Sequence, residues 1–297
     1  MGSRWIDLVD PTADELAAVL PPTADAEIVE GLAAPPTERR DTRPGIEGRE
    51  GAALVVLAVP VSEPGLEEVS YLELDVLVTT ERVVTVRKRD GEGRLAAPPA
   101  LEAADDDRPP RALLHAVLDD VADRYLDFLD ALYAAIDELE DGVDALAGPT
   151  VRRRVADLRH ELLRARRATS ATRAIVRRIL DERVRLPDAT PVGVDHGFVD
   201  TYETLVRVTE ELDVARDLLS SVRDYYQAKV AEGQNEVGKK LTVVASLVLV
   251  PSLIVGFYGQ NFQSAFDDAF WSIGVSVGLI VATTVVQLAL FRWRRWI

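Results

Sequence analysis

The sequence contains no cysteine. This absence excludes disulfide bridges, thiolate metal sites and cysteine nucleophiles. Histidine is scarce as well, since His115, His160 and His196 are far apart and share no spacing typical of metal ligands. A glycine-rich phosphate loop and a nucleophile elbow are also missing. We therefore expect no enzyme active site.

Positive charge is in short supply, and the formal net charge of the chain is −16. Binding to nucleic acid needs a basic surface, so this balance argues against a nucleic-acid partner. An acidic surface is consistent with solubility or salt adaptation, or with local enrichment of cations near an entry or exit. The first residues, MGSRWIDLVDPTADE, lack the apolar region of a secretory signal, so we expect no such signal there.

Two long runs near the C-terminus carry no charge, Leu241 to Tyr258 and Phe270 to Phe291. As a helix with a rise of ~1.5 Å per residue, each run is long enough to cross ~30 Å of hydrocarbon. Lys239 and Lys240 precede the first run, and a basic tail, 292–297, follows the second. The loop between the runs has no Lys or Arg, so the positive-inside rule predicts cytoplasmic N- and C-termini. We expect a multi-pass protein of the cell inner (plasma) membrane.

The first hundred residues show the pattern of a small α/β domain. Strands are expected at 4–8, 52–59, 68–78 and 82–89, with the last two forming a hairpin. Thr12 and Glu15 have the spacing of a capping box, which predicts a short helix, and a second is expected over 23–32. Residues 35–50 are expected to form a polar loop. The sheet should be at least partly antiparallel.

Helical periodicity begins at Pro109. Apolar residues recur at helical spacing from there to Leu146, and after Gly148-Pro149 a second helix is expected from Val151, with Thr150 as its N-cap. A third helix carries a heptad pattern and has no strong stop before the first uncharged run. Its seam consists of Leu205, Val208, Leu212, Ala215, Leu219, Val222 and Tyr226. We therefore predict one continuous helix from about Gly197 to Tyr258.

The expected fold class is an α+β cytoplasmic domain followed by long helices and two C-terminal transmembrane helices. The predicted parts are the α/β domain (1–108), an antiparallel helix pair (109–194), a cytoplasmic stalk helix (195–240), the first transmembrane helix (241–258), an external loop (259–269), the second transmembrane helix (270–291) and the basic tail (292–297).

The outer end of the first uncharged run has an unusual composition, Tyr258-Gly259-Gln260-Asn261-Phe262. Glycine permits a close backbone approach or a non-helical turn. Gln260 and Asn261 place neutral amide oxygens at the membrane surface. Such oxygens suit a hydrated cation, and Mg²⁺ in particular keeps several of its waters.

This stretch resembles the signature of the CorA family of divalent-cation channels and transporters, Gly-Met-Asn or more broadly Gly-x-Asn between Tyr and Phe. Lys240-Leu241-Thr242, Pro251 and the basic tail also fit the family pattern. The similarity covers nearly the whole chain and implies a funnel-shaped homopentamer that transports Mg²⁺ across the lipid bilayer, with the first transmembrane helix lining the pore. Gln260 replaces the usual Met of the signature, and the zinc-transporting branch of the family also varies at this position.

The resemblance also implies roles for individual residues. Asn261, with Gly259 and Gln260 beside it, would form the selectivity filter. Ser252 would face the pore, Leu241 would lie in a hydrophobic gate, and Asn235 would form a polar ring at the cytoplasmic mouth. Gly238 stands where a bulky gate residue is common, which suggests a looser gate.

The family also has a regulatory divalent-cation site between neighbouring cytoplasmic domains. By position, Asp200 matches one carboxylate and Glu50 resembles the other. Bound Mg²⁺ would hold the gate closed. Two alternatives remain open at this point: a Zn²⁺, Co²⁺ or Ni²⁺ transporter of the same family, with or without proton coupling, and a non-conducting, membrane-anchored ion sensor.

Overall fold

The computed structural model describes residues 3–20, 26–35, 44–49, 51–61, 69–101, 108–184, 186–187, 196–259 and 269–296. The chain divides into two compact units, Met1–Val222 and Arg223–Ile297. The expected long helix is present as α5 (His196–Tyr258), and it contributes residues to both units.

A five-stranded sheet forms the centre of the first unit. Its strands are β1 (Trp5–Val9), β2 (Gly45–Arg49), β3 (Ala52–Val61), β4 (Ser70–Thr79) and β5 (Val83–Arg87), in the spatial order β1-β5-β4-β3-β2. β1 runs parallel to β5, whereas the other neighbouring pairs are antiparallel. The expected hairpin of β4 and β5 and the partly antiparallel character of the sheet are therefore confirmed.

Strand β2 was not expected, because residues 35–50 have the composition of a polar loop. Within its sequence GIEGR, Ile46 is the only large apolar residue, so no alternating pattern can be recognised. The strand exists because its backbone pairs with β3 from Gly45↔Val56 to Arg49↔Ala52, and because Ile46 is buried. Arg178 of the helix α4 (Gly148–Leu180) also donates a hydrogen bond to the carbonyl of Ile46 at 2.8 Å.

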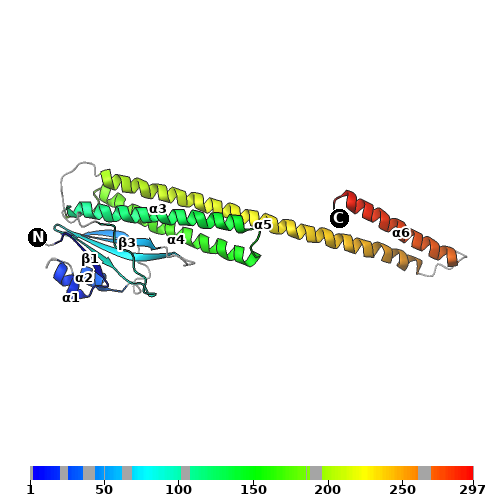
Figure 1. The fold of residues 1–297 in the computed structure, drawn as a ribbon, viewed down its shortest axis with the longest axis horizontal. Coiled ribbons are helices and arrows are strands. Elements are labelled where there is room, and N and C mark those ends of the chain that lie inside the picture. The colour runs from blue at the N-terminus through cyan, green and yellow to red at the C-terminus, as the bar shows by residue number, and fades with distance from the viewer. Residues whose placement is uncertain are drawn as a thin grey trace. The chain divides into compact units, whose positions relative to one another are not determined.

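Two short helices, α1 (Ala13–Val19) and α2 (Ala26–Ala33), cover one face of the sheet (Figure 1). The predicted capping box is present, with the Thr12 amide donating to Oε2 of Glu15 at 2.8 Å and the Glu15 amide donating to Oγ1 of Thr12 at 3.3 Å. The amide and the hydroxyl of Thr12 both donate to Oε2 of Glu15, and these two hydrogen bonds hold the pKa of Glu15 below its usual value. The core beneath the two helices consists of Leu16, Leu20, Ile28, Leu32, Leu77, Val84 and Val86.

The opposite face of the sheet is covered by α3 (Pro110–Gly142) and α4 (Figure 1). The hydroxyl of Tyr125 on α3 donates a hydrogen bond to the carbonyl of Ala58 on β3 at 2.6 Å, and burial raises the pKa of this tyrosine. Thr150 does not cap α4, contrary to expectation, because the helix already begins at Gly148 and its N-cap is Ala147. Pro149 fits the first helical turn, where a missing N–H costs nothing.

Most of the predicted heptad seam of α5 is buried, namely Leu205, Val208, Leu212, Ala215, Leu219 and Val222, whereas its last member, Tyr226, is only partly buried. Polar contacts flank this seam. The hydroxyl of Tyr133 on α3 donates a hydrogen bond to Oε2 of Glu211 at 2.7 Å, and burial together with this carboxylate raises the pKa of Tyr133 to about 12. Arg166 of α4 forms an ion pair with Asp213 of α5 at 2.5 Å.

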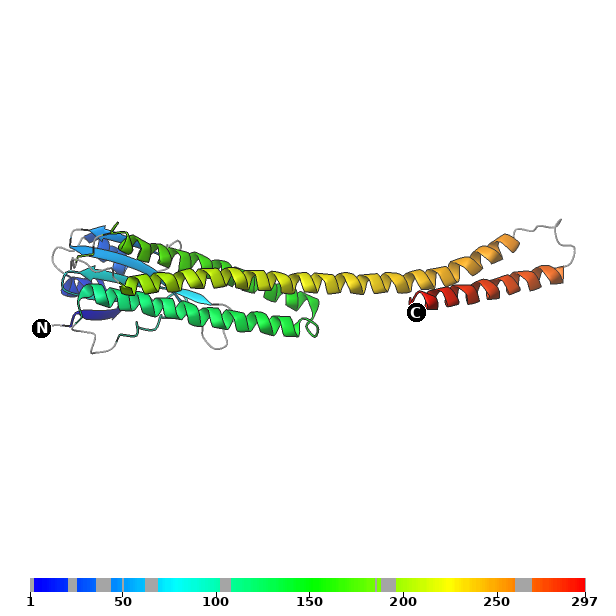
Figure 2. The same cartoon turned by 90° about the horizontal axis from the view of Figure 1, so that it is seen from above.

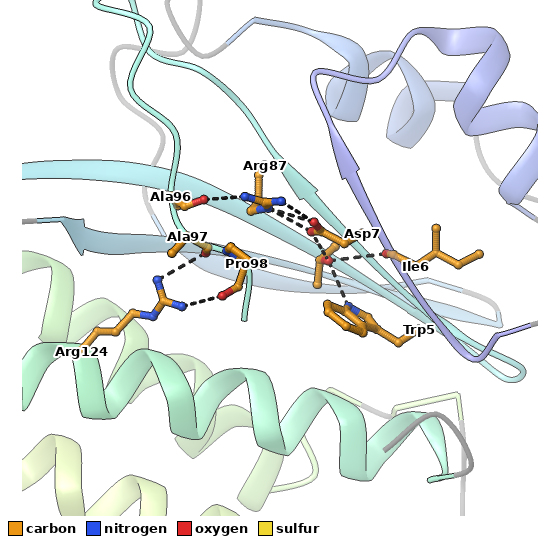
Figure 3. A network of polar contacts seen from close by, with 9 residues as sticks. Trp5, Ile6, Asp7, Arg87, Ala96, Ala97, Pro98 and Arg124 are labelled. Atoms are coloured by element: carbon orange, nitrogen blue, oxygen red, sulfur yellow. Dashed lines mark hydrogen bonds and ion pairs between the residues drawn. The ribbon is translucent and has the colours of Figure 1, made fainter. Parts of the chain in front are cut away.

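A polar network ties the β1 edge of the sheet to α3 (Figure 3). The guanidinium of Arg87 contacts both carboxylate oxygens of Asp7 through Nε, at 3.1 and 3.0 Å, and donates through Nη1 to the carbonyl of Ala96 at 2.7 Å. Arg124 on α3 then donates to the carbonyls of Ala97 and Pro98, at 3.3 and 2.8 Å. The segment after β5 is thus held between the sheet and the helices by two arginines.

The second unit consists of the later part of α5 and of α6 (Ala269–Trp293), which lie side by side (Figure 2). Both helices are long and apolar enough to cross a membrane. Pro251 lies inside α5, where it cannot donate a backbone hydrogen bond to the carbonyl of Leu247.

Candidate functional site

The apolar part of α5 contains three serine and threonine side chains, and the hydroxyl of each bonds to its own helix. Thr242 donates to the carbonyl of Gly238 at 2.9 Å, Ser246 to that of Thr242 at 2.7 Å, and Ser252 to that of Val248 at 2.7 Å. In hydrocarbon a polar group has no water to bond, so these internal bonds allow the hydroxyls to sit in an apolar helix.

One side of this part of α5 packs against α6. Val243 and Ile254 are buried, with exposed fractions of 6% and 8%. They are about three helical turns apart and so lie on the same side of the helix. Near this side, Nε2 of Gln287 on α6 donates a hydrogen bond to the carbonyl oxygen of Ser246 at 3.3 Å. Val243, Ser246 and Ile254 therefore mark the α6-facing side of α5.

The residues expected to line a pore lie on the opposite side. Ser252 follows Val243 by about two and a half turns, which places it on the far side of the helix. Leu241 and Gly259 lie about three turns before and two turns after Ser252, and so share its side. All three are exposed, Leu241 to 68%. We call the side that carries Leu241, Ser252 and Gly259 the outer stripe of α5.

Asn235, a further residue of the expected pore, does not continue the outer stripe. Asn235 is exposed and lies ~120° around the helix from Leu241, taking ~100° per residue. At Gly238 an added Cβ would meet no atom within 4 Å, so this position is open space in the second unit. The geometry brings Leu241, Ser252 and Gly259 together but leaves Asn235 to one side.

The filter residues lie where α5 ends. The amide of Gly259 donates to the carbonyl of Val255 at 2.8 Å, and a Cβ at Gly259 would lie 3.0 Å from that same oxygen. A side chain would therefore be tight at this position, which suits glycine. Gln260 and Asn261, the other members of the expected filter, lie outside the described residues.

The expected regulatory carboxylates belong to the first unit. Asp200 is exposed in the first turns of α5, whereas its neighbours Phe198 and Thr201 are buried. The hydroxyl of Thr201 donates to Oδ1 of Asp119 on α3 at 3.0 Å, which anchors this end of α5. Glu50 lies outside the described residues, so its position relative to Asp200 stays a prediction. Asp200 itself points away from the anchored side.

The described part of the chain contains no group of three His, Asp or Glu side chains arranged to hold a metal ion. Negative charge follows one side of α3, where Asp119, Asp123 and Asp127 recur at about every turn. Burial and the charges of Asp119, Asp120 and Asp127 raise the pKa of Asp123. The negative charges of these aspartates repel one another, and together they attract cations without selecting among them.

Sequence reasoning missed two positions in these units. Gln287 was not singled out, although an amide inside an uncharged run of a span is a recognisable signal. Gly197 marks the start of α5, but its close approach to His115 depends on the packing of α3 against α5 and leaves no trace in the sequence.

Comparison with known proteins agrees with this architecture. The chain is 24% identical over 263 residues to the cobalt/magnesium transport protein CorA of Thermotoga maritima, covering 86% of this chain and 73% of that relative. It is also 24% identical over 309 residues to the cobalt/magnesium transport protein CorA of Methanocaldococcus jannaschii, covering 99% of this chain and 91% of the relative.

Solved structures share the fold. The complete structure of the CorA magnesium transporter from Methanocaldococcus jannaschii matches with a TM-score of 0.77 at 22% identity, over 99% of this chain and 91% of that one. The ZntB cytoplasmic domain from Vibrio parahaemolyticus matches with a TM-score of 0.58 at 12% identity, over 78% of this chain and 90% of that one. Residues 2–294 match the family described as CorA-like Mg²⁺ transporter protein. The chain therefore belongs to the CorA-like family of Mg²⁺ transporters, membrane proteins that carry divalent cations and are not classical enzymes.

Proposed function

We propose that this chain forms a homopentameric channel that admits Mg²⁺ through the inner membrane, with α5 innermost. The observation that carries the proposal is the division of α5 into two sides. Its α6-facing side holds Val243 and Ile254, and its outer stripe holds Leu241, Ser252 and Gly259. Two helices enclose no passage, so a pore needs a closed ring of copies. In such a ring the outer stripe is free to line the passage while α6 faces lipid.

The proposed filter lies at the outer end of α5, at Gly259, Gln260 and Asn261. Amide and carbonyl oxygens from several copies would hold a cation through its water shell. This suits Mg²⁺, which gives up its waters reluctantly. Ser252 would offer hydroxyls further along the same passage, and Leu241 would form the apolar gate with Asn235 at its cytoplasmic mouth. Both termini would then be cytoplasmic.

Regulation is proposed to act through Asp200. Its carboxylate is exposed, and α5 continues from it as one helix to Leu241. A Mg²⁺ ion shared between Asp200 and a carboxylate of a neighbouring copy, proposed to be Glu50, would offset the repulsion between acidic subunits. The ion favours the closed ring only as far as it binds that state more tightly.

Ion flux into liposomes that contain the purified protein tests the proposal, with Mg²⁺, Zn²⁺, Co²⁺ and Ni²⁺ compared. We expect Mg²⁺ to enter, and the mass of the detergent-solubilised complex to equal that of five chains. Asn261→Ala should abolish selective uptake and leave this mass unchanged, because alanine supplies no amide oxygen. Uptake of Zn²⁺ without Mg²⁺ would assign the chain to the zinc-transporting alternative. A complete lack of flux would favour the membrane-anchored sensor, and a monomer or dimer would contradict the ring.

A further inference from the structure

Gln287 is the one amide side chain in the uncharged run from Phe270 to Phe291. Two hydroxyl side chains of α6 bond to their own helix, Ser276 to the carbonyl of Ile273 at 2.9 Å and Thr283 to that of Leu279 at 2.8 Å. Gln287 behaves differently, because its Nε2 crosses to α5 and donates to the carbonyl oxygen of Ser246 at 3.3 Å. The contact therefore joins the two spans directly.

Chemistry fixes the orientation of this amide. A carbonyl oxygen can only accept, so the nitrogen of Gln287 must face Ser246. The other amide atom, Oε1, is buried and accepts no hydrogen bond from any described residue. Burying an unpaired acceptor is costly, and leucine would avoid that cost. A polar residue kept inside a span despite such a cost is expected to have a function.

The contact lies next to a position in α5 where a backbone hydrogen bond of the helix is missing. Pro251 has no N–H, so the carbonyl of Leu247 lacks its usual helical donor. Ser246 immediately precedes Leu247, and it lies near the side on which Val243 and Ile254 are buried. Packing of apolar side chains opposes rotation of α5 only weakly, because lipid is as apolar as α6. A directional hydrogen bond at Ser246 opposes rotation much better.

We infer that Gln287 is a positioning residue for ion passage, and this rests on the proposed function above. By holding the backbone of α5 at Ser246, Gln287 keeps Leu241 and Ser252 turned away from α6. It would contact neither the ion nor the filter. Loss of the hydrogen bond lets α5 rotate relative to α6, so that the outer stripe no longer lines the passage evenly in every copy.

The first test compares Gln287→Met with Thr283→Val by Mg²⁺ flux into liposomes. Methionine fills a similar volume but cannot donate. A hydrogen bond between spans contributes ~0.6 kcal/mol on average, which is roughly a threefold change in an equilibrium, so we expect flux to fall roughly threefold or more. Thr283→Val removes a hydroxyl one turn away that bonds only to carbonyls of α6, of Leu279 and Ile280, and should keep wild-type flux. Wild-type flux in Gln287→Met would overturn the inference.

The second test uses Gln287→Glu, whose flux is measured from acidic to alkaline pH and divided by wild-type flux at the same pH. A carboxylic acid donates a hydrogen bond to Ser246, whereas a carboxylate can only accept. No other ionisable side chain lies in 241–257 or 270–291, so the variant residue is the titrating group of the spans. We expect near wild-type flux when it is protonated and the flux of Gln287→Met when it is ionised.

The pH response is measured within one preparation of assembled protein, so a defect in expression or assembly cannot produce it. A flat ratio across the pH range would overturn the inference even if Gln287→Met transports poorly. Lack of flux in the wild type, by contrast, would contradict the proposed function. In that case the melting temperature of Gln287→Glu against pH, compared with the wild type, still tests the hydrogen bond. A melting temperature with the same pH dependence as the wild type would overturn the inference.

Discussion

A Cβ atom at Gly197 would lie 2.6 Å from Nε2 of His115. The imidazole cannot move freely, because it packs edge-on against the ring of Phe198, with 5.3 Å between the ring centroids, and lies 3.3 Å from the hydroxyl of Thr201. The start of α5 therefore approaches α3 more closely than any residue with a side chain allows.

Gly197→Ala is expected to destabilise the first unit. Alanine favours a helix by ~1 kcal/mol over glycine, but overpacking costs ~1–3 kcal/mol, and here the nearest atoms belong to a constrained ring. We expect the apparent melting temperature of the full-length protein to fall by roughly 5 °C. The control is Gly233→Ala in the same helix, where an added Cβ meets nothing within 4 Å. Equal melting temperatures for the two variants would show that the His115 ring moves aside with no loss of stability.

Much of the fold could be predicted from the regular spacing of apolar residues in the sequence. The apolar seams of α3 and α5 depend on regular spacing, which the sequence displays directly, and residues such as Leu205 and Leu212 are buried as predicted. Strand β2 was missed because its pairing with β3 is made by the backbone, and a backbone can pair whatever its side chains are. The Arg87–Asp7 contact was missed for a related reason: β1 and β5 become neighbours only after the sheet has formed.

The candidate site, too, could be predicted only in part from the sequence. A signature of small and polar residues identifies the outer end of α5, and helical spacing then puts Leu241, Ser252 and Gly259 on one side. Which side of α5 meets α6 cannot be derived from two uniformly apolar runs. The burial of Val243 and Ile254 and the hydrogen bond from Gln287 supply that information.

Asp123→Asn is expected to stabilise the protein at neutral pH. Burial and the charges of Asp119, Asp120 and Asp127 raise the pKa of Asp123, so the folded state holds the proton more tightly than the unfolded chain, whose value is near 3.8. Stability contributed by this group is present below 3.8 and is lost as the pH rises through the raised pKa. At pH ~7 asparagine should therefore raise the melting temperature, by about 1–2 °C after allowance for solvent screening.

The measurement is the difference in melting temperature between variant and wild type against pH and salt. The difference should vanish at acidic pH, where the aspartate is protonated, and shrink in high salt. The matched control is Asp120→Asn, which removes the 2.9 Å ion pair with Arg124 on the same helix and should lower the melting temperature instead. A loss of stability in both variants would mean that repulsion along α3 is negligible.

Cysteine labelling can test the two sides of α5. The chain has no cysteine, so Ser252→Cys and Ile254→Cys each introduce a single thiol. Ser252 lies on the outer stripe and Ile254 faces α6. A water-soluble, positively charged thiol reagent should label Ser252→Cys in proteoliposomes and reduce its Mg²⁺ flux. Ile254→Cys should label slowly and keep its flux, and the reverse pattern would put the passage on the other side of α5.

Asp200→Ala is expected to flatten the response of the first unit to Mg²⁺. The carboxylate is exposed, while Phe198 and Thr201 on the same turns are buried against α3, so its loss should not disturb packing. A regulatory ion has to bind in the millimolar range to report cellular Mg²⁺, and exposed carboxylates that leave the ion its waters suit that range. Because α5 has no break between Asp200 and Leu241, a movement at one can reach the other along the helix.

Limited proteolysis across a Mg²⁺ titration at constant ionic strength measures this response. In the wild type, bound Mg²⁺ should protect the first unit from proteolysis by holding the proposed ring of copies together. Asp200→Ala removes one site and one negative charge from each copy, so the closed ring can persist but its protection should depend little on Mg²⁺. Asp217→Ala removes another exposed carboxylate of α5, one that pairs with Arg216 at 3.1 Å, and serves as the charge-matched control. If Asp200→Ala and Asp217→Ala give the same protection curve as the wild type, Asp200 is an ordinary surface acid and Mg²⁺ is sensed elsewhere.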